Sequence, residues 1–517
     1  MREIRSIVRA TESNFEAANA VQLSSRQRRF VGISIAVLLA LRVLGMFFVP
    51  YTDTTEARYA EIARKMMETN DWITPQFDYG VPFWGKPPLH TWVSALGMKI
   101  FGANEFGGRI FIFAIACGMV ALLYRWVKKE RGRDMAMLAT LGLLGCGIFF
   151  VSMAAVMTDL VMLFGTSLCM VAFWNALERE KNRRLWGYLF FVGLAIGLLA
   201  KGPVATALTG VPIGMWVLFQ NRWKDTWQRI PWIKGTLLML LIAGPWYALA
   251  EHKTPGFLKY FIVGEHIERF LVKGWSGDLY GRGHAKARGM IWVLWILAVL
   301  PWTPFYLAPF RRTKTIIQGM KGAEGSWPFY LLCWATSPML FFTVATNIIP
   351  TYVITGVPAG CILAVELWSM VANRDPVPSR LAIRFFAGTS VAATAIFALG
   401  LLSFNGFIGL SRKKSQKQMV ADVEAMSVDS PSVLNYWPKR IYSAEFYSRG
   451  AAKAVVQPEE IAALLTNDER DFLVVRKAYQ SAIPQDLLDS FTEVEEVGGD
   501  VLMLEKPQTL NAHALAQ

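Results

Sequence analysis

Long apolar runs dominate this chain and limit the structures that it can adopt. Eleven of them, each long enough or nearly long enough to cross a bilayer, lie near residues 30–50, 107–127, 134–154, 159–177, 186–200, 204–219, 235–250, 289–309, 327–345, 351–372 and 385–404. With 54% hydrophobic residues and a mean hydropathy of +0.33 over 517 residues, the chain is too apolar for a soluble protein of this length. We therefore predict a mainly α-helical, polytopic membrane protein.

Clusters of lysine and arginine separate these runs and predict their orientation. With eleven spans, all the clusters fall on one side of the membrane, which the positive-inside rule identifies as the cytoplasm. Residues 1–29 are then a cytoplasmic segment, residues 30–408 a transmembrane domain, and residues 409–517 lie outside. Topology and anionic lipid headgroups account for the net charge of +14, so we expect membrane lipids and no nucleic acid as partners. The clusters are Arg26/Arg28/Arg29, Arg125/Lys128/Lys129/Arg131/Arg133, Arg179/Lys181/Arg183/Arg184, Arg222/Lys224/Arg229, Arg311/Arg312/Lys314 and Arg374/Arg380/Arg384.

The last hundred residues have the mixed pattern of a small α/β domain. Residues 458–465 and 484–491 predict helices, and residues 471–475 and 501–504 predict strands. The region contains no glycine-rich phosphate loop and no cysteine. We interpret it as a scaffold or docking module.

The first outer loop, residues 51–106, is rich in charged residues although it directly follows a membrane span. After Asp53, alanine and methionine recur every three or four residues as far as Met67, which predicts an amphipathic helix lying on the outer leaflet. Asp53 and Glu56 have two interpretations. They are either the N-cap and the third-position acid of a capping box, or acids that take part in catalysis.

A rigid turn in the same loop holds Lys86. Pro87 and Pro88 restrict the backbone after this lysine, which would hold its ammonium in place as a point charge suited to a phosphate oxygen. The alternative is an interface lysine whose ammonium reaches up to the headgroups from a rigid turn.

Two further charged residues lie at the outer ends of spans. Runs 186–200 and 204–219 are short, so Lys201 at their junction would lie below the headgroups, where a lysine is costly unless it faces a polar cavity. Lys201 is therefore a candidate for lining a cavity. Asp159 begins the fourth span, either as a helix N-cap or as an acidic residue of that cavity.

The second large outer loop, residues 251–288, is basic, contrary to the positive-inside rule. Its seven lysines and arginines predict an anionic ligand on this face, although a long loop also tolerates such charge. His266 and Arg269 are about one helical turn apart, and Arg269 is suited to a bidentate phosphate contact, although a solvated surface helix would have a similar sequence. Tyr352, at the start of the tenth span, is either an interfacial tyrosine or a hydrogen-bond donor to phosphate.

The predicted topology places all of these candidates on the outer side. Acids and anion-binding cations on one face of a membrane bundle suit an enzyme that acts on a phosphate-bearing lipid. The five cysteines lie inside apolar runs without ligand spacing and predict neither a disulfide nor a metal site. The candidates are Asp53, Glu56, Arg58, Lys86, His90, Asp159, Lys201, His266, Arg269 and Tyr352.

Short motifs among these residues occur in the order found in a known family. They are Glu56-Ala-Arg58-Tyr59-Ala-Glu61, Asn70-Asp71-Trp72, Phe83-Trp-Gly-Lys86-Pro87-Pro88, Met157-Thr-Asp159, Ala200-Lys201-Gly202, Glu265-His266-Ile-Glu-Arg269 and Pro350-Thr-Tyr352. The series resembles the aminoarabinose transferases of lipid A modification, GT-C glycosyltransferases related to protein O-mannosyltransferases. This resemblance covers most of the chain. It implies the GT-C fold, with about 11–13 transmembrane helices and a small periplasmic α/β domain, in the inner membrane of a bacterium.

The resemblance also implies a reaction. A sugar would move, with inversion at its anomeric carbon, from an undecaprenyl-phosphate carrier to lipid A or another envelope glycolipid at the periplasmic face. The residues that it assigns to the carrier phosphate are Arg58, Lys86, Lys201, Arg269 and Tyr352. The implied catalytic acids are Asp53, Glu56 and Asp159, and His90 and His266 are possible substrate contacts.

Three positions depart from the family pattern. Asp53 and Glu56 are separated here, where the family has adjacent Asp-Glu, so either could be the working acid. Gly85 replaces an acid that precedes the Lys-Pro pair, which removes a possible metal ligand, so a divalent metal is possible but no zinc site is carried over. Asn347 replaces a lysine before Tyr352. The sugar and the acceptor therefore stay open.

Two rival functions are considered. A protein O-glycosyltransferase would have the same fold and a different acceptor. A transporter or flippase of lipid-linked sugars would have paired charges deep in its spans and inverted repeats, and the sequence has no sign of either.

Overall fold

A computed structural model describes residues 22–281, 284–307, 313–314, 316, 326–372, 376–403, 414–427, 433–467 and 469–507. Most of the predicted cytoplasmic segment 1–29, the basic residues Arg311, Arg312 and Arg374, and Arg282 of the second outer loop lie outside this description. The chain divides into two compact units. One consists of Met1–Met46 and Lys65–Ala398, and the other of Phe47–Arg64 and Leu399–Gln517.

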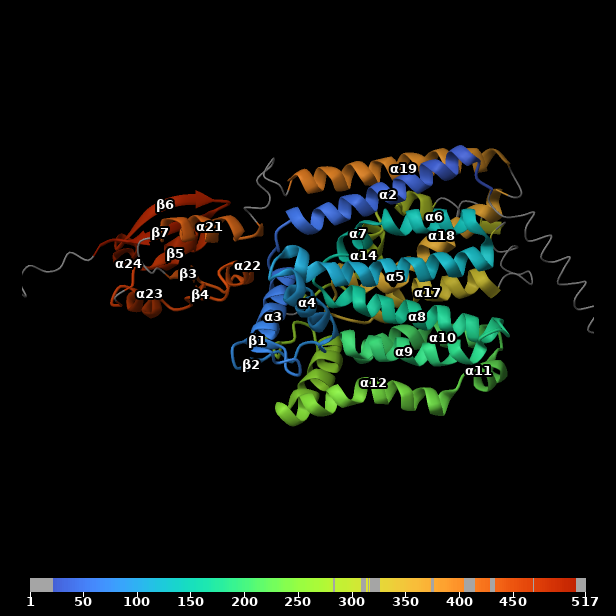
Figure 1. Ribbon diagram of the computed structural model, residues 1–517, viewed down its shortest axis with the longest axis horizontal. Coiled ribbons are helices and arrows are strands. Elements are labelled where there is room, and N and C mark those ends of the chain that lie inside the picture. Colours follow the sequence, from blue (N-terminus) through green and yellow to red (C-terminus); the bar gives the residue numbers. More distant parts are fainter. Residues whose placement is uncertain are drawn as a thin grey trace, which may run out of the picture. The chain divides into compact units, whose positions relative to one another are not determined.

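The first unit is a bundle of long helices with roughly parallel axes (Figure 1). Each of the eleven apolar runs contains helix, as the hydropathy pattern predicted. The helices are α2 (Ser25–Phe48), α5 (Glu105–Arg131), α6 (Arg133–Leu144), α7 (Gly147–Ser152), α8 (Thr158–Glu178), α9 (Arg183–Lys201), α10 (Pro203–Phe219), α11 (Trp223–Arg229), α12 (Trp232–Lys253), α14 (Met290–Ala298), α15 (Thr303–Leu307), α17 (Ser326–Phe342), α18 (Val357–Ala372) and α19 (Pro376–Leu402).

Seven helical stretches of the described residues are long and apolar enough to cross a membrane on their own. The chain is therefore a multi-pass membrane protein. The helices α10 and α17 are shorter, at 17 residues each, and two other runs are divided into the pairs α6/α7 and α14/α15. The count of eleven spans accordingly stays a prediction. The seven stretches are Ser25–Phe48, Glu105–Arg131, Thr158–Glu178, Arg183–Lys201, Trp232–Lys253, Pro350–Met370 and Arg384–Leu402.

Helix α8 lies at the centre of the bundle. In its most apolar stretch, 94% of the residues are buried, and α8 packs against α5, α9 and α10. Gly165 and Gly193 allow α8 and α9 to approach closely, since a Cβ at Gly165 would lie 2.8 Å from the Gly193 carbonyl oxygen. Small residues at helix contacts are typical of membrane bundles, where close backbone approach replaces the hydrophobic driving force. The tight pair α8/α9 holds Asp159 and Lys201 in place.

Short elements of the two outer loops complete the first unit. The first loop has the hairpin β1 (Gln76–Asp78) and β2 (Val81–Pro82), followed by helix α4 (Leu89–Phe101). The second loop contains a ten-residue π-helix, η1 (Lys259–Glu268), continued by α13 (Arg269–Leu271), and the short 3₁₀ helix η4 (Pro350–Gly356) precedes α18. π-Helices are rare and are frequently found at functional sites.

Helix α3 (Thr55–Thr69) differs from the amphipathic helix that the sequence predicted. Glu61, Arg64 and Lys65 lie between the recurring alanines and methionines, where an amphipathic helix on the outer leaflet would expose its charges, but they are only 1%, 3% and 1% exposed. Arg64 donates to both oxygens of Glu61 at 2.7 and 2.8 Å, and Lys65 donates to the Phe77 carbonyl at 3.1 Å. The prediction of an exposed charged face was wrong because pairing lets these groups be buried.

The second unit contains a five-stranded mixed sheet in the order β4-β3-β5-β7-β6. Strand β3 pairs in parallel with β4 and β5, whereas β7 pairs antiparallel with β5 and β6. Two separate clusters of buried apolar residues form the core of this unit. One includes residues of α21 and α22, and the other includes residues of α23 and α24. The predicted α/β domain is confirmed, including both of its predicted helices and both strands. Its elements are α21 (Lys417–Met426), β3 (Leu434–Trp437), α22 (Tyr442–Tyr447), β4 (Lys453–Ala454), α23 (Pro458–Leu464), β5 (Phe472–Arg476), α24 (Gln485–Asp489), β6 (Phe491–Val497) and β7 (Asp500–Glu505).

Candidate active site

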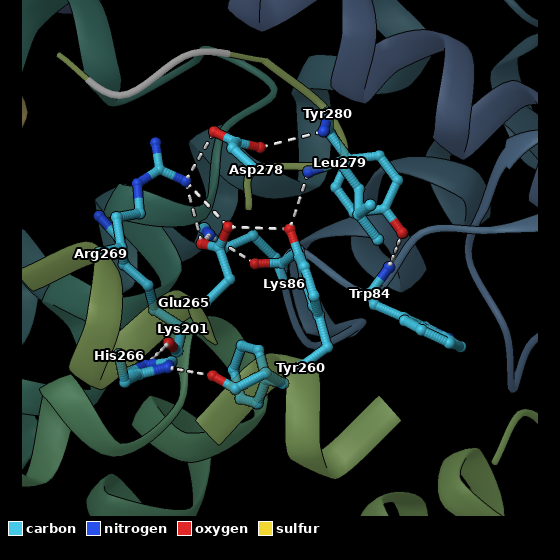
Figure 2. Close-up of polar contacts among 12 residues, drawn as sticks. Trp84, Lys86, Lys201, Tyr260, Glu265, His266, Arg269, Asp278, Leu279 and Tyr280 are labelled. Atoms are coloured by element: carbon cyan, nitrogen blue, oxygen red, sulfur yellow. Dashed lines mark hydrogen bonds and ion pairs between the residues drawn. The ribbon is translucent and has the colours of Figure 1, made fainter. Parts of the chain in front are cut away.

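Lys86 and Arg269 meet at one buried carboxylate, that of Glu265 (Figure 2). The Lys86 ammonium donates to Glu265 Oε2 at 2.7 Å, and Arg269 Nη1 donates to Oε1 at 2.9 Å and to Oε2 at 3.1 Å. Arg269 also forms an ion pair of 3.2 Å with Asp278. Two of the predicted phosphate-binding residues, Lys86 and Arg269, thus lie together. The carboxylates of Glu265 and Asp278 accompany them.

The first outer loop holds Lys86 firmly. The Lys86 ammonium donates to the Gly85 carbonyl as well as to Glu265. The Tyr280 hydroxyl accepts a hydrogen bond from Trp84 N at 2.9 Å and donates to the Pro82 carbonyl at 2.8 Å, which connects this turn to the second loop. Lys86 is therefore positioned by its own turn and by the second loop together.

The π-helix η1 determines how the second loop presents its side chains. Its wide turn brings residues five apart close together, as the hydrogen bond from Arg269 N to the Gly264 carbonyl illustrates. The Tyr260 hydroxyl accordingly lies 3.4 Å from Glu265 Oε1, and His266 Nδ1 lies 2.7 Å from the Phe261 carbonyl. This arrangement directs Glu265, His266 and Arg269 to one side of the loop.

Lys201 pairs with Asp159 across the contact between α9 and α8. The ammonium donates to Asp159 Oδ1 at 2.7 Å and lies 5.0 Å from the ring centroid of Tyr352. His266 Nε2 is 3.3 Å from the Lys201 carbonyl. Each of the three cations, Lys86, Lys201 and Arg269, thus has an acidic partner.

A cavity of about 210 Å³ joins these groups. One part of its wall is polar and includes Lys86, Lys201, Glu265, His266, Arg269, Asn347 and Tyr352. The other part is apolar and is formed by Met162, Pro203, Val204, Ala207, Leu208, Phe270, Phe341 and Phe342. Lys201 lines a cavity, as its position at a short junction predicted. An anionic headgroup with an attached apolar chain would match both parts of the wall.

The charged surroundings shift the pKa values of the acids and bases outside the spans. Burial alone would raise the pKa of Glu265, but the charges of Lys86 and Arg269 outweigh it and hold that pKa below its usual value. Burial lowers the pKa of His266. Burial, together with the charge of Lys86, lowers the pKa of His90 to about 3. Glu265 is therefore ionised at neutral pH, and His90 is uncharged.

His90 is fully buried in the first turn of α4, at 0% exposure. Its Nε2 lies 3.3 Å from the Thr91 hydroxyl. His90 is absent from the described wall of the cavity, whereas His266 is part of that wall. The predicted substrate contact is therefore supported by position for His266 only.

Asp53, Glu56 and Arg58 belong to the second unit. Helix α3 begins at Thr55, so Glu56 is its second residue and not the third, as the capping interpretation required. The Asp53 carboxylate instead accepts hydrogen bonds from the backbone N–H of Ser443, at 3.1 Å, and from the Ser443 hydroxyl. Burial raises the pKa of Asp53. The Arg58 guanidinium lies over the ring of Tyr442, 5.8 Å from its centroid.

Three polar residues of the first unit's site were not among the predicted site residues. Glu265 and Asp278 accept from the cations, and Asn347 Nδ2 donates to the carbonyls of Arg269 and Val272 at 2.7 and 2.9 Å. The four-residue spacing of Glu265 and Arg269 could have indicated an ion pair. Asp278 and Asn347 carry no such local signal, because Arg269 lies nine residues before Asp278 and the partners of Asn347 lie 75 and 78 residues before it.

The described residues contain no group of three or more His, Cys, Asp or Glu side chains placed to hold a metal ion. All five cysteines are free thiols, and four of them are buried.

Comparisons with known proteins point in one direction. Residues 29–261 match the family model described as dolichyl-phosphate-mannose-protein mannosyltransferase. An undecaprenyl phosphate-α-4-amino-4-deoxy-L-arabinose arabinosyl transferase of Edwardsiella ictaluri is 32% identical over 58% of this chain and 52% of its own length. A protein of the same name from Shewanella sediminis is 28% identical over 72% of this chain and 67% of its own length. The predicted resemblance to the aminoarabinose transferases is confirmed. In the first-ranking matches, the chain spans about half the length of these curated relatives.

Solved structures extend the likeness to nearly the whole chain. ArnT from Cupriavidus metallidurans, bound to undecaprenyl phosphate, superimposes with a TM-score of 0.74 and 18% identity over 92% of this chain and 98% of its own. An oligosaccharyltransferase from Archaeoglobus fulgidus gives a TM-score of 0.53 and 12% identity over 88% of this chain and 70% of its own. At such identities the comparison shows the fold. The chain has the GT-C fold of the aminoarabinose transferases.

Proposed function

We propose that this protein is an inverting glycosyltransferase that moves a sugar from an undecaprenyl-phosphate carrier to lipid A or another envelope glycolipid. The observation that carries the proposal is the cavity in which Lys86, Lys201 and Arg269 face an apolar wall. The arabinosyl transferases among its relatives are named for an undecaprenyl-phosphate donor, and ArnT was solved bound to undecaprenyl phosphate.

The cations act on the leaving group. When the bond between the anomeric carbon and the phosphate oxygen breaks, its electron pair stays on the carrier phosphate, which gains negative charge. Lys86 and Arg269, supported by Lys201 and the Tyr352 hydroxyl, stabilise this charge more strongly in the transition state than in the bound donor. Arg269 is suited to a bidentate contact, and Lys86 acts as a point charge.

An acid on the acceptor side completes the reaction. Asp159 orients the acceptor nucleophile or takes its proton as it attacks the face of the sugar opposite the phosphate. The proposal for the first-loop acids, Asp53 or Glu56, is tested separately by the activities of Asp53→Ala and Glu56→Ala in the transfer assay. A phosphate acceptor needs no strong base, whereas a hydroxyl acceptor does.

The proposed location is the inner membrane of a bacterium. The basic clusters place the N-terminus in the cytoplasm. The C-terminal α/β domain and both large outer loops then face the periplasm, where a lipid-linked donor and a lipid A acceptor meet.

The test is a reconstituted transfer reaction. The purified protein is supplied with undecaprenyl-phosphate sugars and lipid A, and release of undecaprenyl phosphate is followed by chromatography. We expect release with at least one sugar donor, and release below one hundredth of the wild-type rate in Lys86→Ala. Full activity in Lys86→Ala would remove the phosphate role of this lysine. Mass spectrometry of lipid A from cells with and without the protein would identify the sugar.

A protein O-glycosyltransferase is the second candidate, favoured by the match of residues 29–261 to the mannosyltransferase family model. Acceptor identity separates the two. If labelled sugar enters periplasmic proteins and not lipid A, this second function replaces the first. A lipid-linked sugar transporter would move the donor across the membrane without releasing undecaprenyl phosphate.

A further inference from the structure

The Glu265 carboxylate occupies the place where a phosphate would be expected. It bridges Lys86 and Arg269, at 2.7 Å from the ammonium and 2.9 Å from the guanidinium, and it is part of the cavity wall. A carboxylate that joins two cations presents two anionic oxygens to them, as a phosphate does. We propose that Glu265 is an internal competitor of the carrier phosphate, displaced when the carrier binds and restored when it leaves. This inference rests on the proposed function.

Other groups hold both cations, so Glu265 is not needed to position them. Arg269 keeps its ion pair with Asp278 at 3.2 Å, and Asp278 is 6% exposed in its side chain. Lys86 keeps its bond to the Gly85 carbonyl in a turn braced by Pro87 and Pro88. When Glu265 loses its charge, Lys86 and Arg269 therefore stay in position and become available to a phosphate.

The charge balance explains why a competitor would be useful. The cavity and its ion pairs combine three cations (Lys86, Lys201 and Arg269) with three carboxylates (Asp159, Glu265 and Asp278). Without Glu265 the three cations would face only two carboxylates, and the remaining positive charge would hold the product, a phosphate monoester with more negative charge than the donor, more tightly. A carboxylate that returns to Lys86 and Arg269 weakens that hold and promotes product release.

The π-helix gives Glu265 a means of moving. The ten residues of η1 form wide turns, and residues 259–268 can tighten towards α-helical geometry, which rotates Glu265 relative to Arg269. The hydroxyl of Tyr260 lies 3.4 Å from Glu265 Oε1 and can follow the carboxylate as an alternative hydrogen-bond donor. The displacement thus requires only a local change in one outer loop.

The experiment measures binding of undecaprenyl phosphate to the full-length protein in lipid nanodiscs, and inhibition of transfer by the same lipid. We expect Glu265→Gln to bind undecaprenyl phosphate about 10-fold more tightly than wild type, because the amide keeps the shape but not the charge. The inhibition constant should fall by a similar factor, and both kcat and KM should fall, because product release slows and the donor phosphate no longer meets a competitor. Glu268→Gln is the matched control, since Glu268 is exposed on the same helix, bonds to Trp275 and should change affinity by less than about twofold.

The outcomes separate this inference from the proposed function. If wild type does not bind undecaprenyl phosphate, the proposed function fails. If wild type binds and Glu265→Gln binds equally or more weakly, Glu265 supports the cations and does not compete with the carrier, and the inference is overturned. If Glu265→Gln does not yield folded protein, Glu265→Ala is measured in its place. Tighter binding of undecaprenyl phosphate by Glu265→Ala is expected, and equal or weaker binding would overturn the inference.

Discussion

At the scale of single residues, the sequence predicted three cations that line the cavity, but not which partners those side chains have. Lys86, Lys201 and Arg269 are the predicted cations, and all three line the cavity. Each is paired with a carboxylate in the structure, so the site is less positive than its sequence suggested. Under the proposed function, a carrier phosphate competes with these carboxylates, so the acids are as informative as the cations.

Lys86→Ala should lower kcat/KM for the lipid-linked donor by at least about 100-fold, because a charge-assisted contact to the leaving phosphate is lost at the transition state. Steady-state transfer assays with wild type and variant measure this loss. Lys253→Ala is a suitable control, since this lysine of the second outer loop pairs with Asp71 at 2.6 Å and is 45% exposed. A comparable loss in both variants would indicate a general effect of outer-face charge.

His90 should make the stability of the protein depend on pH. Its pKa of about 3 in the folded state lies below the usual 6.5, so below about pH 6.5 the unfolded chain takes up a proton that the folded protein does not. The free energy of unfolding should therefore fall as pH drops from 6.5 towards 3, by about 1.4 kcal/mol per pH unit from this group. Melting temperatures between pH 7 and 5 should decline less steeply in His90→Gln than in wild type.

At the scale of elements, the junction between α9 and α10 contacts the loop that forms part of the cavity wall. Helix α9 ends and α10 begins around Gly202, whose φ of +87° suits a residue without a Cβ. A Cβ there would lie 2.5 Å from the Phe261 ring and 3.1 Å from His266 Cε1. The junction of two short spans thus packs directly against the π-helix that carries Glu265.

Gly202→Ala should displace Phe261 and His266 and weaken carrier binding by about 10-fold, because both backbone strain and a ring clash must be relieved. Binding of undecaprenyl phosphate in nanodiscs measures the effect. Gly210→Ala, about two turns further along α10, has open space around the new methyl group and should bind as wild type does. Equal affinity in the two variants would contradict the role of this junction.

At the scale of the whole molecule, the sequence predicts which parts face the periplasm. The α/β unit has exposed acids on β6, and the predicted cytoplasmic side has the exposed basic residues Lys181, between α8 and α9, and Arg184, at the start of α9. Four of the five native cysteines are buried, which leaves little background for labelling at introduced thiols.

A membrane-impermeant thiol reagent should therefore label Glu493→Cys in β6 in cells with a permeabilised outer membrane. Arg184→Cys, at the start of α9, should be labelled only after the inner membrane is broken. Gel shifts of the two variants report the difference. The reverse pattern would invert the topology and move the cavity to the cytoplasmic side.

The sequence alone determined the apolar helices, the elements of the α/β domain and the cations Lys86, Lys201 and Arg269. Hydropathy, strand and helix patterns and proline-braced turns are local properties, and a run of about twenty residues contains them. Only the tertiary structure decided what those side chains contact. Glu265 reaches Lys86 over 179 residues, Lys201 reaches Asp159 over 42, and Ser443 reaches Asp53 over 390. Such pairings depend on how distant segments pack, so no periodicity in the sequence signals them, and they decide which charges a carrier phosphate meets.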